Sequence, residues 1–537
     1  MSKQQETITN VDAVVVGAGF TGLYALYRLR EMGLKVQGFE AGSDVGGTWY
    51  WNRYPGARTD STCTVYQYWF SDELLDEWNW EERFPSQAET ERYLNFVADK
   101  FDLRKSFQFS SRVTAASFDE RTQRWLVTIE DGTKLQSQFL LMGTGGLTEP
   151  VYPDIPGVGD FEGESFHTSR WPREKADFSG KRVGIIGTAA TGIQVIQTIA
   201  SEVSELTVFQ RTPNYTIPMQ NFKLDDEMRQ KYRQEMPLIK QKVHETFTGH
   251  DYGTDPRPFS EVPEAERREI MERLWADGTL AYWAGSFAEL FTDEAVNEEF
   301  SKFAREKIRA RIKDPALAEK LLPTDHGFGT RRVPLETNYY EAFNRDNVTL
   351  VDVNETSIES ITHTGIKTSA QEHQFDVLIY ATGFEVGTGA LTRIDIRGSD
   401  GTSLKECWAK DAETFMGMQV HGYPNMFTVM APMSPGAAYC NVPTCSQQQV
   451  EWITDCIDHV RKQRQQSIEP TREAQNQWVA HHDEVGAVML AHKTRSWHVT
   501  TTSDGRTRPV AYAGGAHVYK QRCDEIKIQG YPEFNLS

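Results

Sequence analysis

Residues 12–40 contain the pattern that most restricts how this chain can fold. A short apolar run, 13–16, leads into the turn Gly17-Ala18-Gly19-Phe20-Thr21-Gly22, and a helical spacing of apolar residues follows. The segment 35–39 then reads as a second strand, and it ends in an acid, Glu40. This order of strand, glycine-rich turn, helix, strand and acid is typical of a Rossmann dinucleotide-binding unit.

Each part of this unit has a physical role in holding a dinucleotide. Gly17 permits the tight turn, Gly19 lets the backbone approach a pyrophosphate, and Gly22 lets helix and strand pack closely. The free N–H groups at the helix start favour phosphates. Glu40 is expected to accept hydrogen bonds from ribose hydroxyls and to repel a 2′-phosphate, which suits FAD or NAD rather than NADP. The alternative is a strand, turn and helix that bind no ligand, but the spacing and the terminal acid both favour dinucleotide binding.

A second unit of the same kind begins at Lys181. The run 183–186 leads to Gly187-Thr188-Ala189-Ala190-Thr191-Gly192, then to a helical pattern and a strand at 206–209. This strand is followed by Arg211-Thr212, so an arginine stands where NAD binding needs an acid. Because an arginine can pair with a 2′-phosphate, we expect NADP(H) at this site. The alternative interpretation is a generic surface arginine.

Two further segments have side chains suited to a cofactor site. The loop 46–60 is dense in glycine, aromatic and charged residues and lacks a helical or strand period, so Trp49 and Trp51 could cover a flat ring. Asp60 is an acid in an aromatic setting, where its ionisation depends on a basic partner. In the turn 328–334, Arg331 and Arg332 are adjacent. One of them could grip an NADP phosphate while the other enters the active site, although arginine pairs are also common at surfaces.

The remaining patterns suggest how the chain is divided. From 109 to 142 the apolar period is two around Asp131-Gly132, which predicts a β-meander, and a second meander ends at 376–384. The glycine-poor, charged segment 221–322 reads as a helical insertion with a solvated charged face. We therefore predict an α/β protein with two Rossmann-like domains and a helical insertion in the second. The expected parts are 1–145 and 381–537 for the FAD domain, 146–220 and 326–380 for the NADP domain, and 221–325 for the insertion.

Composition limits the partners and the compartment. The chain has 537 residues and a net charge of −19, which argues against nucleic acid or an anionic membrane as a partner. The polar start, 1–6, lacks the apolar core of a signal peptide, and no stretch approaches about 20 apolar residues. We expect a cytoplasmic protein, a monomer or weak homo-oligomer, without a metal site. No C-x-x-C occurs, so we expect six reduced thiols. These are Cys63, Cys407, Cys440, Cys445, Cys456 and Cys523.

Between the two units lies a more specific motif. It has Phe161, Gly163, His167, Trp171 and Pro172 at the spacing F-x-G-x-x-x-H-x-x-x-W-P. With the two dinucleotide units, it resembles the signature of the type I Baeyer–Villiger monooxygenases, of the phenylacetone and cyclohexanone monooxygenase group. The resemblance runs along roughly residues 10–535.

The resemblance implies FAD on the first unit, NADPH on the second, and a small-molecule ketone and O₂ as substrates. NADPH reduces FAD, O₂ forms a C4a-peroxyflavin, and this attacks the ketone to give an ester or lactone, with sulfoxidation as a side activity. Arg332 is expected to stabilise the developing negative charge, and Asp60 to hold Arg332. His167 is expected to link the domains. Besides the two glycine-rich turns, the residues expected at the cofactors are Glu40, Thr48, Trp49, Arg58, Asp60, Tyr66, Arg211, Thr212, Arg331, Arg332 and Trp497.

Three other functions fit these residues less well than ketone oxidation. A heteroatom-oxidising flavin monooxygenase would share both units, but Trp171-Pro172 and the pairing of Arg332 with Asp60 favour ketone oxidation. A disulfide reductase lacks its C-x-x-C. A non-catalytic redox sensor would not need Asp60 and Arg332.

Overall fold

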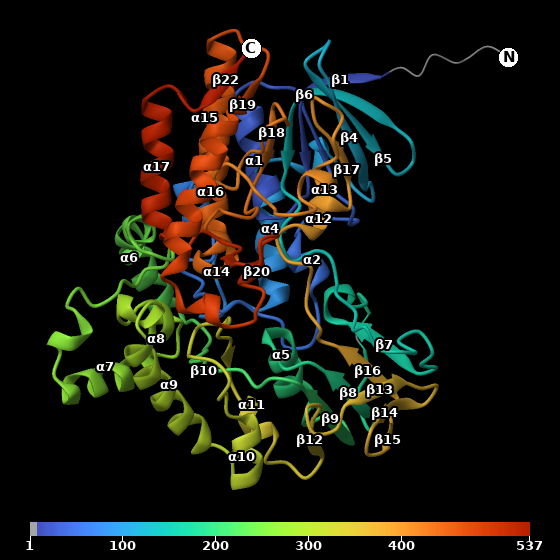
Figure 1. The fold of residues 1–537 in the computed structure, drawn as a ribbon, viewed down its shortest axis with the longest axis vertical. Coiled ribbons are helices and arrows are strands. Elements are labelled where there is room, and N and C mark those ends of the chain that lie inside the picture. The colour runs from blue at the N-terminus through green and yellow to red at the C-terminus, as the bar shows by residue number, and fades with distance from the viewer. Residues whose placement is uncertain (1–7, 175) are drawn as a thin grey trace.

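The computed structural model describes residues 8–174 and 176–537 and shows two lobes, each built around a parallel-strand sheet (Figure 1). The polar start, expected to lack a signal segment, lies outside the described residues. Within the described ranges, none of the helices combines the length and the apolar character needed to cross a bilayer.

The first lobe is organised by an eight-stranded sheet with β1 near its centre. Strand β1 pairs in parallel with β2 on one side and with β6 on the other, with Val15 opposite both Gly38 and Leu141. The predicted meander is confirmed, because β4, β5 and β6 pair antiparallel in sequence order. The strands are β1 (Thr9–Val16), β2 (Val36–Phe39), β3 (Phe107–Gln108), β4 (Val113–Asp119), β5 (Arg124–Ile129), β6 (Lys134–Met142), β17 (Asp395–Arg397) and β18 (Met426–Thr428).

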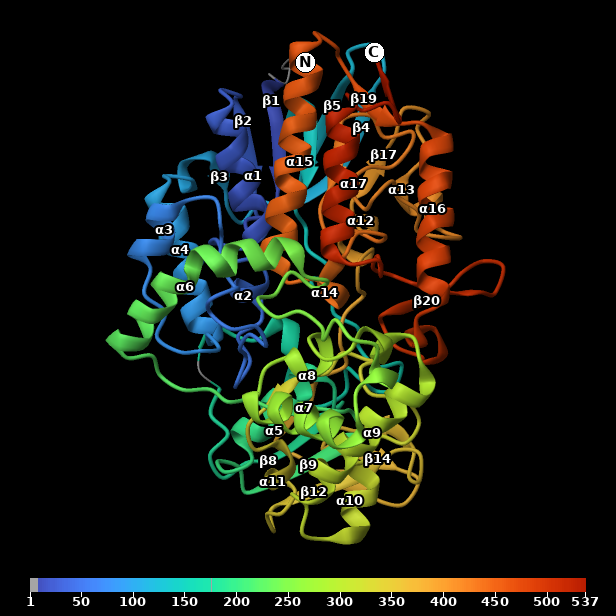
Figure 2. The same cartoon turned by 90° about the vertical axis from the view of Figure 1, so that its left-hand side faces the viewer.

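Helices from both ends of the chain cover one face of this sheet. In α1 (Phe20–Glu31), Leu23, Leu26 and Leu29 recur at three-residue steps and are fully buried. They form one core with residues of α15 (Val442–Lys462), α16 (Arg472–Ala487) and α17 (Ala516–Ile528). Figure 2 shows these three late helices standing side by side next to β1 and α1. The C-terminal segment therefore completes the first lobe.

The second lobe holds a five-stranded, all-parallel sheet in the order β12-β9-β8-β16-β7. Its central strands are β8 (Arg182–Ile186) and β16 (Val377–Tyr380), with Val183 opposite Val377. Helix α5 (Ala190–Ile199) follows β8 directly and leads into β9 (Glu205–Gln210), as the second dinucleotide unit predicts. The other strands are β7 (Glu164–His167) and β12 (Val348–Asp352), and a small antiparallel sheet is formed by β13 (Ile358–Ile361), β14 (Gly365–Thr368) and β15 (Glu372–Gln374).

The helical insertion is confirmed, and its inner face is part of the second lobe's core. In α9 (Glu294–Arg309), the Asp293 carboxylate caps the helix by accepting from the N–H groups of Ala295 and Val296. Phe300 and Ile308 on this helix are fully buried and belong to the same apolar cluster as the sheet. The other helices are α6 (Asp226–Glu245), α7 (Glu264–Asp277), α8 (Ala281–Ala284) and α10 (Pro315–Leu321).

One feature near residue 440 differs from the sequence-based expectation. Cys440 and Cys445, expected to be reduced, form a disulfide. The turn between α14 (Gly436–Tyr439) and α15 brings their Cα atoms to 6.3 Å, within the span of a disulfide, which sequence spacing alone does not reveal. Helix α15 begins at Val442, and Pro443 fits its first turn, where the missing N–H is not needed.

His167 stands where the chain crosses between the lobes. It ends β7 and is buried, with its Nδ1 accepting from the Ser169 N–H at 3.1 Å. Its Nε2 lies 3.4 Å from the Thr382 hydroxyl, and its ring contacts Tyr152. Burial, with a smaller contribution from the charge of Arg170, lowers the pKa of His167 to about 4. The ring is therefore neutral and ties together the two crossing segments.

The lowered pKa of His167 predicts that acid destabilises the folded protein. The unfolded chain binds a proton at His167 below about pH 6.5, whereas the folded chain does so only near pH 4, so folded-state stability falls as the pH decreases through this window. The steepest contribution is about 1.4 kcal/mol per pH unit. We expect His167→Gln to flatten the decline of the melting temperature between pH 6.5 and 4.5. His363→Gln, at an exposed histidine, should leave the slope unchanged; equal slopes for all three proteins would contradict this assignment.

Candidate functional site

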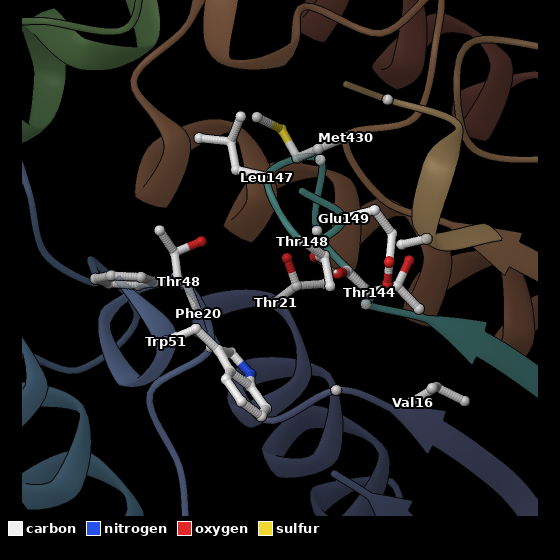
Figure 3. Close-up of a pocket in the computed structure, with 18 of the residues that line it drawn as sticks. Val16, Phe20, Thr21, Thr48, Trp51, Thr144, Leu147, Thr148, Glu149 and Met430 are labelled. Carbon is white, nitrogen blue, oxygen red and sulfur yellow. Dashed lines mark hydrogen bonds between the residues drawn. The ribbon is translucent and has the colours of Figure 1, made fainter. Parts of the chain in front are cut away.

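A deep cavity runs along the carboxyl ends of the first sheet. Its floor is the turn from Gly17 to Thr21, and Figure 3 shows side chains from distant parts of the chain around it, among them Thr48, Thr144 and Met430. At its outer end it reaches Trp497. Such an edge, where strands β1 and β6 end beside a helix start, is where open α/β sheets bind ligands.

Glycines let the chain close tightly around the floor of this cavity. Gly17 has a φ of +99°, and a Cβ there would lie 2.4 Å from the Gly143 carbonyl oxygen. A Cβ on Gly22 would lie 1.7 Å from the Gly17 carbonyl oxygen. Gly19 packs against Gly47, whose Cα would be 3.2 Å from an added Cβ. The turn, the end of β6 and the loop after β2 therefore touch without side chains between them.

Glu40 is fixed by backbone groups at the end of β2. Its Oε2 accepts from the Ala18 N–H at 2.8 Å and its Oε1 accepts from the Gly42 N–H at 2.6 Å. Burial raises the pKa of this carboxyl group, and the two N–H donors oppose that rise. Each oxygen keeps a lone pair for a ribose hydroxyl, and the side chain lines the cavity.

Thr48, Trp49 and Tyr66 line the same cavity. Thr48 and Trp49 lie in a single helical turn, α2 (Thr48–Trp51), within the segment expected to be a loop. The Trp49 indole N–H donates to the Tyr66 hydroxyl at 3.2 Å, and their rings meet edge to face. The two aromatic rings therefore form a fixed wall.

Sequence reasoning missed a group of arginines at this cavity. Arg112, Arg170 and Arg393 all line it, and Arg393 pairs with Glu149 at 3.0 Å. The guanidinium of Arg170 also lies over the Trp51 ring. They come from three distant segments, so no local pattern could connect them.

The second dinucleotide unit also closes tightly. Gly187 has a φ of +110°, and a Cβ there would lie 2.4 Å from the Ala381 carbonyl oxygen. Thr188 donates its hydroxyl hydrogen bond to the Thr212 carbonyl at 3.1 Å. Ala189 is the N-cap of α5, and Thr191 and Gly192 lie in its first turn. Ala189 is exposed, so the start of this helix is accessible to solvent.

Near this unit, Arg211 and Arg331 carry two positive charges, but among the described residues only one acidic side chain, Asp325, forms an ion pair with either of them. Burial lowers the pKa of Arg331, and the nearby charge of Arg211 lowers it further. Arg331 has only a long ion pair with Asp325, at 3.8 Å, and its buried Nε has no hydrogen-bond partner in the described ranges. The exposed Arg211 side chain makes no ion pair among the described residues. Such a pair of cations fits a phosphate.

Arg332 and Asp60 meet although they are 272 positions apart. The Arg332 Nη2 lies 3.3 Å from the Asp60 Oδ2, and the Leu335 N–H points to the other carboxylate oxygen at 3.4 Å. Burial raises the pKa of Asp60, and the charge of Arg332 opposes that rise. The guanidinium also lies 5.5 Å from the centre of the Trp283 ring. The arrangement places one fixed cation in a mostly buried, aromatic setting.

Two buried histidines lie within the field of Arg332. Burial and the Arg332 charge together lower the pKa of His250 to about 3 and that of His498 to about 3. His250 is hydrogen-bonded to Ser61 at 3.0 Å. Sequence reasoning did not connect either residue with Arg332, because both are distant in the chain and neither belongs to a motif.

Two expected site residues have other surroundings. Arg58 pairs with Glu82 at 3.1 Å, and its carbonyl accepts from Gln194 of α5, so it joins the two lobes. Trp497 is 37% exposed and lines the cavity of the first lobe.

The two sites fit FAD and NADP. The first has a glycine floor, a fixed acid that lines the cavity and several cationic side chains, and the second has a glycine-rich turn at a helix start and two arginines with only one long ion pair between them. Among residues 8–174 and 176–537, no group of three or more histidine, cysteine or acidic side chains is placed to hold a metal ion.

Comparison with known proteins agrees with this fit. The flavin-binding monooxygenase-like family matches residues 11–221. An acetone monooxygenase (methyl acetate-forming) from Gordonia sp. is 49% identical over 532 residues, covering 98% of this chain and 99% of that protein. A Baeyer–Villiger monooxygenase from Pseudooceanicola batsensis is 38% identical, covering 97% and 95%. The crystal structure of the OTEMO complex with FAD and NADP superposes with a TM-score of 0.95 at 42% identity, covering 98% and 99%. This chain therefore belongs to the Baeyer–Villiger monooxygenases, a group of FAD- and NADP-dependent enzymes within the flavin-binding monooxygenases.

Proposed function

We propose that this enzyme inserts one oxygen atom of O₂ next to the carbonyl group of a small ketone, giving an ester or lactone. The second oxygen atom leaves as water, and NADPH supplies the two electrons. Bound FAD supplies the redox chemistry that joins these half-reactions. The observation that carries the proposal is the partly buried Arg332 guanidinium, held by Asp60 at the junction of the two lobes. The 49% identity to a protein named for acetone oxidation supports a small ketone.

Arg332 provides charge stabilisation rather than proton transfer. Its guanidinium keeps a fixed positive charge and presents several N–H donors. When the ketone carbonyl carbon is attacked, negative charge develops on the carbonyl oxygen, and a preorganised cation in a dry site lowers the barrier. Asp60 orients Arg332 through the 3.3 Å contact, and the Asn214 amide fixes the Arg332 carbonyl at 3.0 Å.

Arg211 and Arg331 bind the 2′-phosphate of NADPH in this proposal. The two arginines repel each other in the free protein, and a dianion between them removes that repulsion. The binding free energy of the phosphate is therefore more favourable than the sum for two isolated ion pairs. NADH has no 2′-phosphate, so the two arginines do not strengthen its binding.

The reaction itself is tested by isotope labelling. With NADPH, ¹⁸O₂ and linear, cyclic and aryl ketones, we expect mass spectrometry to show an ester or lactone carrying one labelled oxygen. Labelled sulfoxide or N-oxide alone, from added sulfide or amine, would instead assign the protein to the heteroatom-oxidising monooxygenases. NADPH consumption that yields only hydrogen peroxide would mean that the ketone panel lacks the substrate.

Arg332→Ala should lower the rate of ester formation by roughly 10²–10³-fold, because it removes the charge that stabilises the developing oxyanion. Flavin reduction by NADPH, followed by anaerobic stopped-flow absorbance, should be retained. Arg257→Ala is the matched control, because Arg257 also pairs with an aspartate, at 2.8 Å, but in an exposed loop. A variant in which only the reduction step is lost would contradict the role assigned to Arg332.

Arg211→Gln and Arg331→Gln should each raise the KM for NADPH by roughly 10–100-fold, the effect of losing one charged hydrogen bond. The KM for NADH should change little, so the ratio of the KM for NADH to the KM for NADPH should fall. Steady-state kinetics with both nucleotides measures this, with Arg345→Gln as a control elsewhere in the same lobe. An unchanged preference in both variants would rule out the 2′-phosphate assignment.

A further inference from the structure

Arg170 is a cation without an acidic partner at the wall of the first lobe's cavity. Its partly buried side chain lines this cavity, and among residues 8–174 and 176–537 no carboxylate lies within ion-pair distance of its guanidinium. The hydrogen bond that its Nη1 donates, to the Ser169 carbonyl at 3.0 Å, goes only to the neighbouring residue. Burial removes part of the water that would solvate this charge, so an anion in the cavity is expected beside it.

Arg170 comes from the second lobe, although the cavity belongs to the first. It ends the short 3₁₀ helix Thr168–Arg170, which follows β7, and β7 pairs in parallel with β16, with His167 opposite Tyr380. Its guanidinium lies 5.2 Å from the centre of the Trp51 ring in α2 of the first lobe. The segment that crosses between the lobes therefore brings a positive charge to the wall of the flavin cavity.

Two further arginines, Arg112 and Arg393, line the same cavity and act on Arg170. Burial lowers the pKa of Arg170, and the charges of the two other arginines lower it further against an opposing carboxylate, Glu149. Arg393 pairs with both nearby acids, with Glu149 at 3.0 Å and with Glu385 at 3.5 Å. Arg112 makes no ion pair within the described ranges. The group therefore keeps an excess of positive charge at the cavity.

Backbone contacts place this group at the end of the cavity that holds Glu40. The Ser111 N–H, next to Arg112, donates to the Glu40 carbonyl at 2.8 Å. Strand β17 begins two residues after Arg393 and pairs in parallel with β4, which begins directly after Arg112. In a Rossmann unit, the acid and the glycine-rich turn hold the adenosine and the pyrophosphate of the dinucleotide. The arginines therefore lie at the end of the cavity that suits the adenosine diphosphate half of FAD.

The pyrophosphate of FAD is the anion that fits this excess charge. The glycine-rich turn offers it uncharged N–H donors and the positive end of the α1 dipole. A guanidinium adds a full positive charge and paired N–H donors that match phosphate oxygens. Figure 3 shows Thr21 of this turn and Trp51, the ring that Arg170 covers, at one cavity. A phosphate bound at the turn thus shares the cavity with the Arg170 guanidinium.

We propose that the Arg170 guanidinium binds the pyrophosphate of FAD, so that a residue of the second lobe helps to retain the flavin in the first. Arg112 and Arg393 strengthen the positive potential around the same phosphates. The proposal rests on FAD binding, which the family membership establishes, and it is independent of which ketone is oxidised. Arg170 is a cofactor-binding residue here and takes no part in oxygen transfer.

The test measures how tightly the purified holoenzyme retains FAD. Flavin fluorescence in a dilution series gives the Kd, because FAD released from the protein becomes more fluorescent. We expect Arg170→Gln to raise the Kd by roughly 10–100-fold, the effect of losing one charged hydrogen bond. Arg170→Lys keeps the charge and should retain most of the affinity. The difference between Arg170→Gln and the unmodified enzyme should shrink as the salt concentration rises, because salt screens the charge interaction that the variant lacks.

Arg173→Gln is the matched control. Arg173 lies in the same segment and also covers an aromatic ring, at 4.3 Å from the centre of the Tyr50 ring, but it is not among the described residues that line the cavity. Its replacement should leave the Kd for FAD unchanged. Circular dichroism and the melting temperature in excess FAD show whether each variant folds. Arg112→Gln, at an exposed side chain, should also raise the Kd and carries the test if Arg170→Gln does not fold.

Retention of FAD is measured without turnover, so this proposal and the proposed reaction fail separately. An unchanged Kd in folded Arg170→Gln and Arg112→Gln would overturn the role of the arginines, even if the enzyme oxidises ketones. An equal loss of FAD in Arg170→Gln and Arg170→Lys, independent of salt, would also overturn it, because packing against Trp51 rather than charge would then hold the flavin. Normal retention by an enzyme that forms no ester would count against the proposed reaction alone.

Discussion

The contact between Asp60 and Arg332 joins the two lobes of the molecule. Asp60 follows the first dinucleotide unit, and Arg332 follows the helical insertion of the second lobe, so the two meet only when both lobes are folded and docked. Their side chains are 11% and 25% exposed, so both charges have lost most of their water. Removing one partner from such a pair typically costs about 3–5 kcal/mol, since the other charge stays buried and unpaired. The fold thus supplies the counter-ion that this partly buried cation needs.

Close docking of the lobes makes that contact possible. Gly56 has a φ of +80°, and a Cβ there would lie 2.5 Å from the Gln194 carbonyl oxygen of α5. Gln194 also accepts from the Tyr54 hydroxyl at 2.9 Å and donates to the Arg58 carbonyl at 3.2 Å. The loop beside the flavin cavity therefore rests on the helix that begins the NADP unit. The two candidate cofactor sites are therefore held in one frame.

The parts of this structure that follow from local spacing were predictable from the sequence. The glycine-rich turns, the antiparallel meander after β3 and the insertion helix capped by Asp293 each follow from neighbours a few residues apart. The Arg170 environment was not predictable, because it depends on where Trp51, Arg112 and Arg393 come together in space. The disulfide between Cys440 and Cys445 was mispredicted for the same reason: a spacing of five residues closes a bond only if the chain turns there.

The field of Arg332 also decides which other groups near it can carry charge. His250 and His498 are both buried within reach of this field, and each is held neutral at ordinary pH. A protonated histidine there would be repelled by the charge of Arg332. Neutral rings can instead donate and accept hydrogen bonds without disturbing it. A single fixed cation therefore leaves its surroundings polar without a second charge.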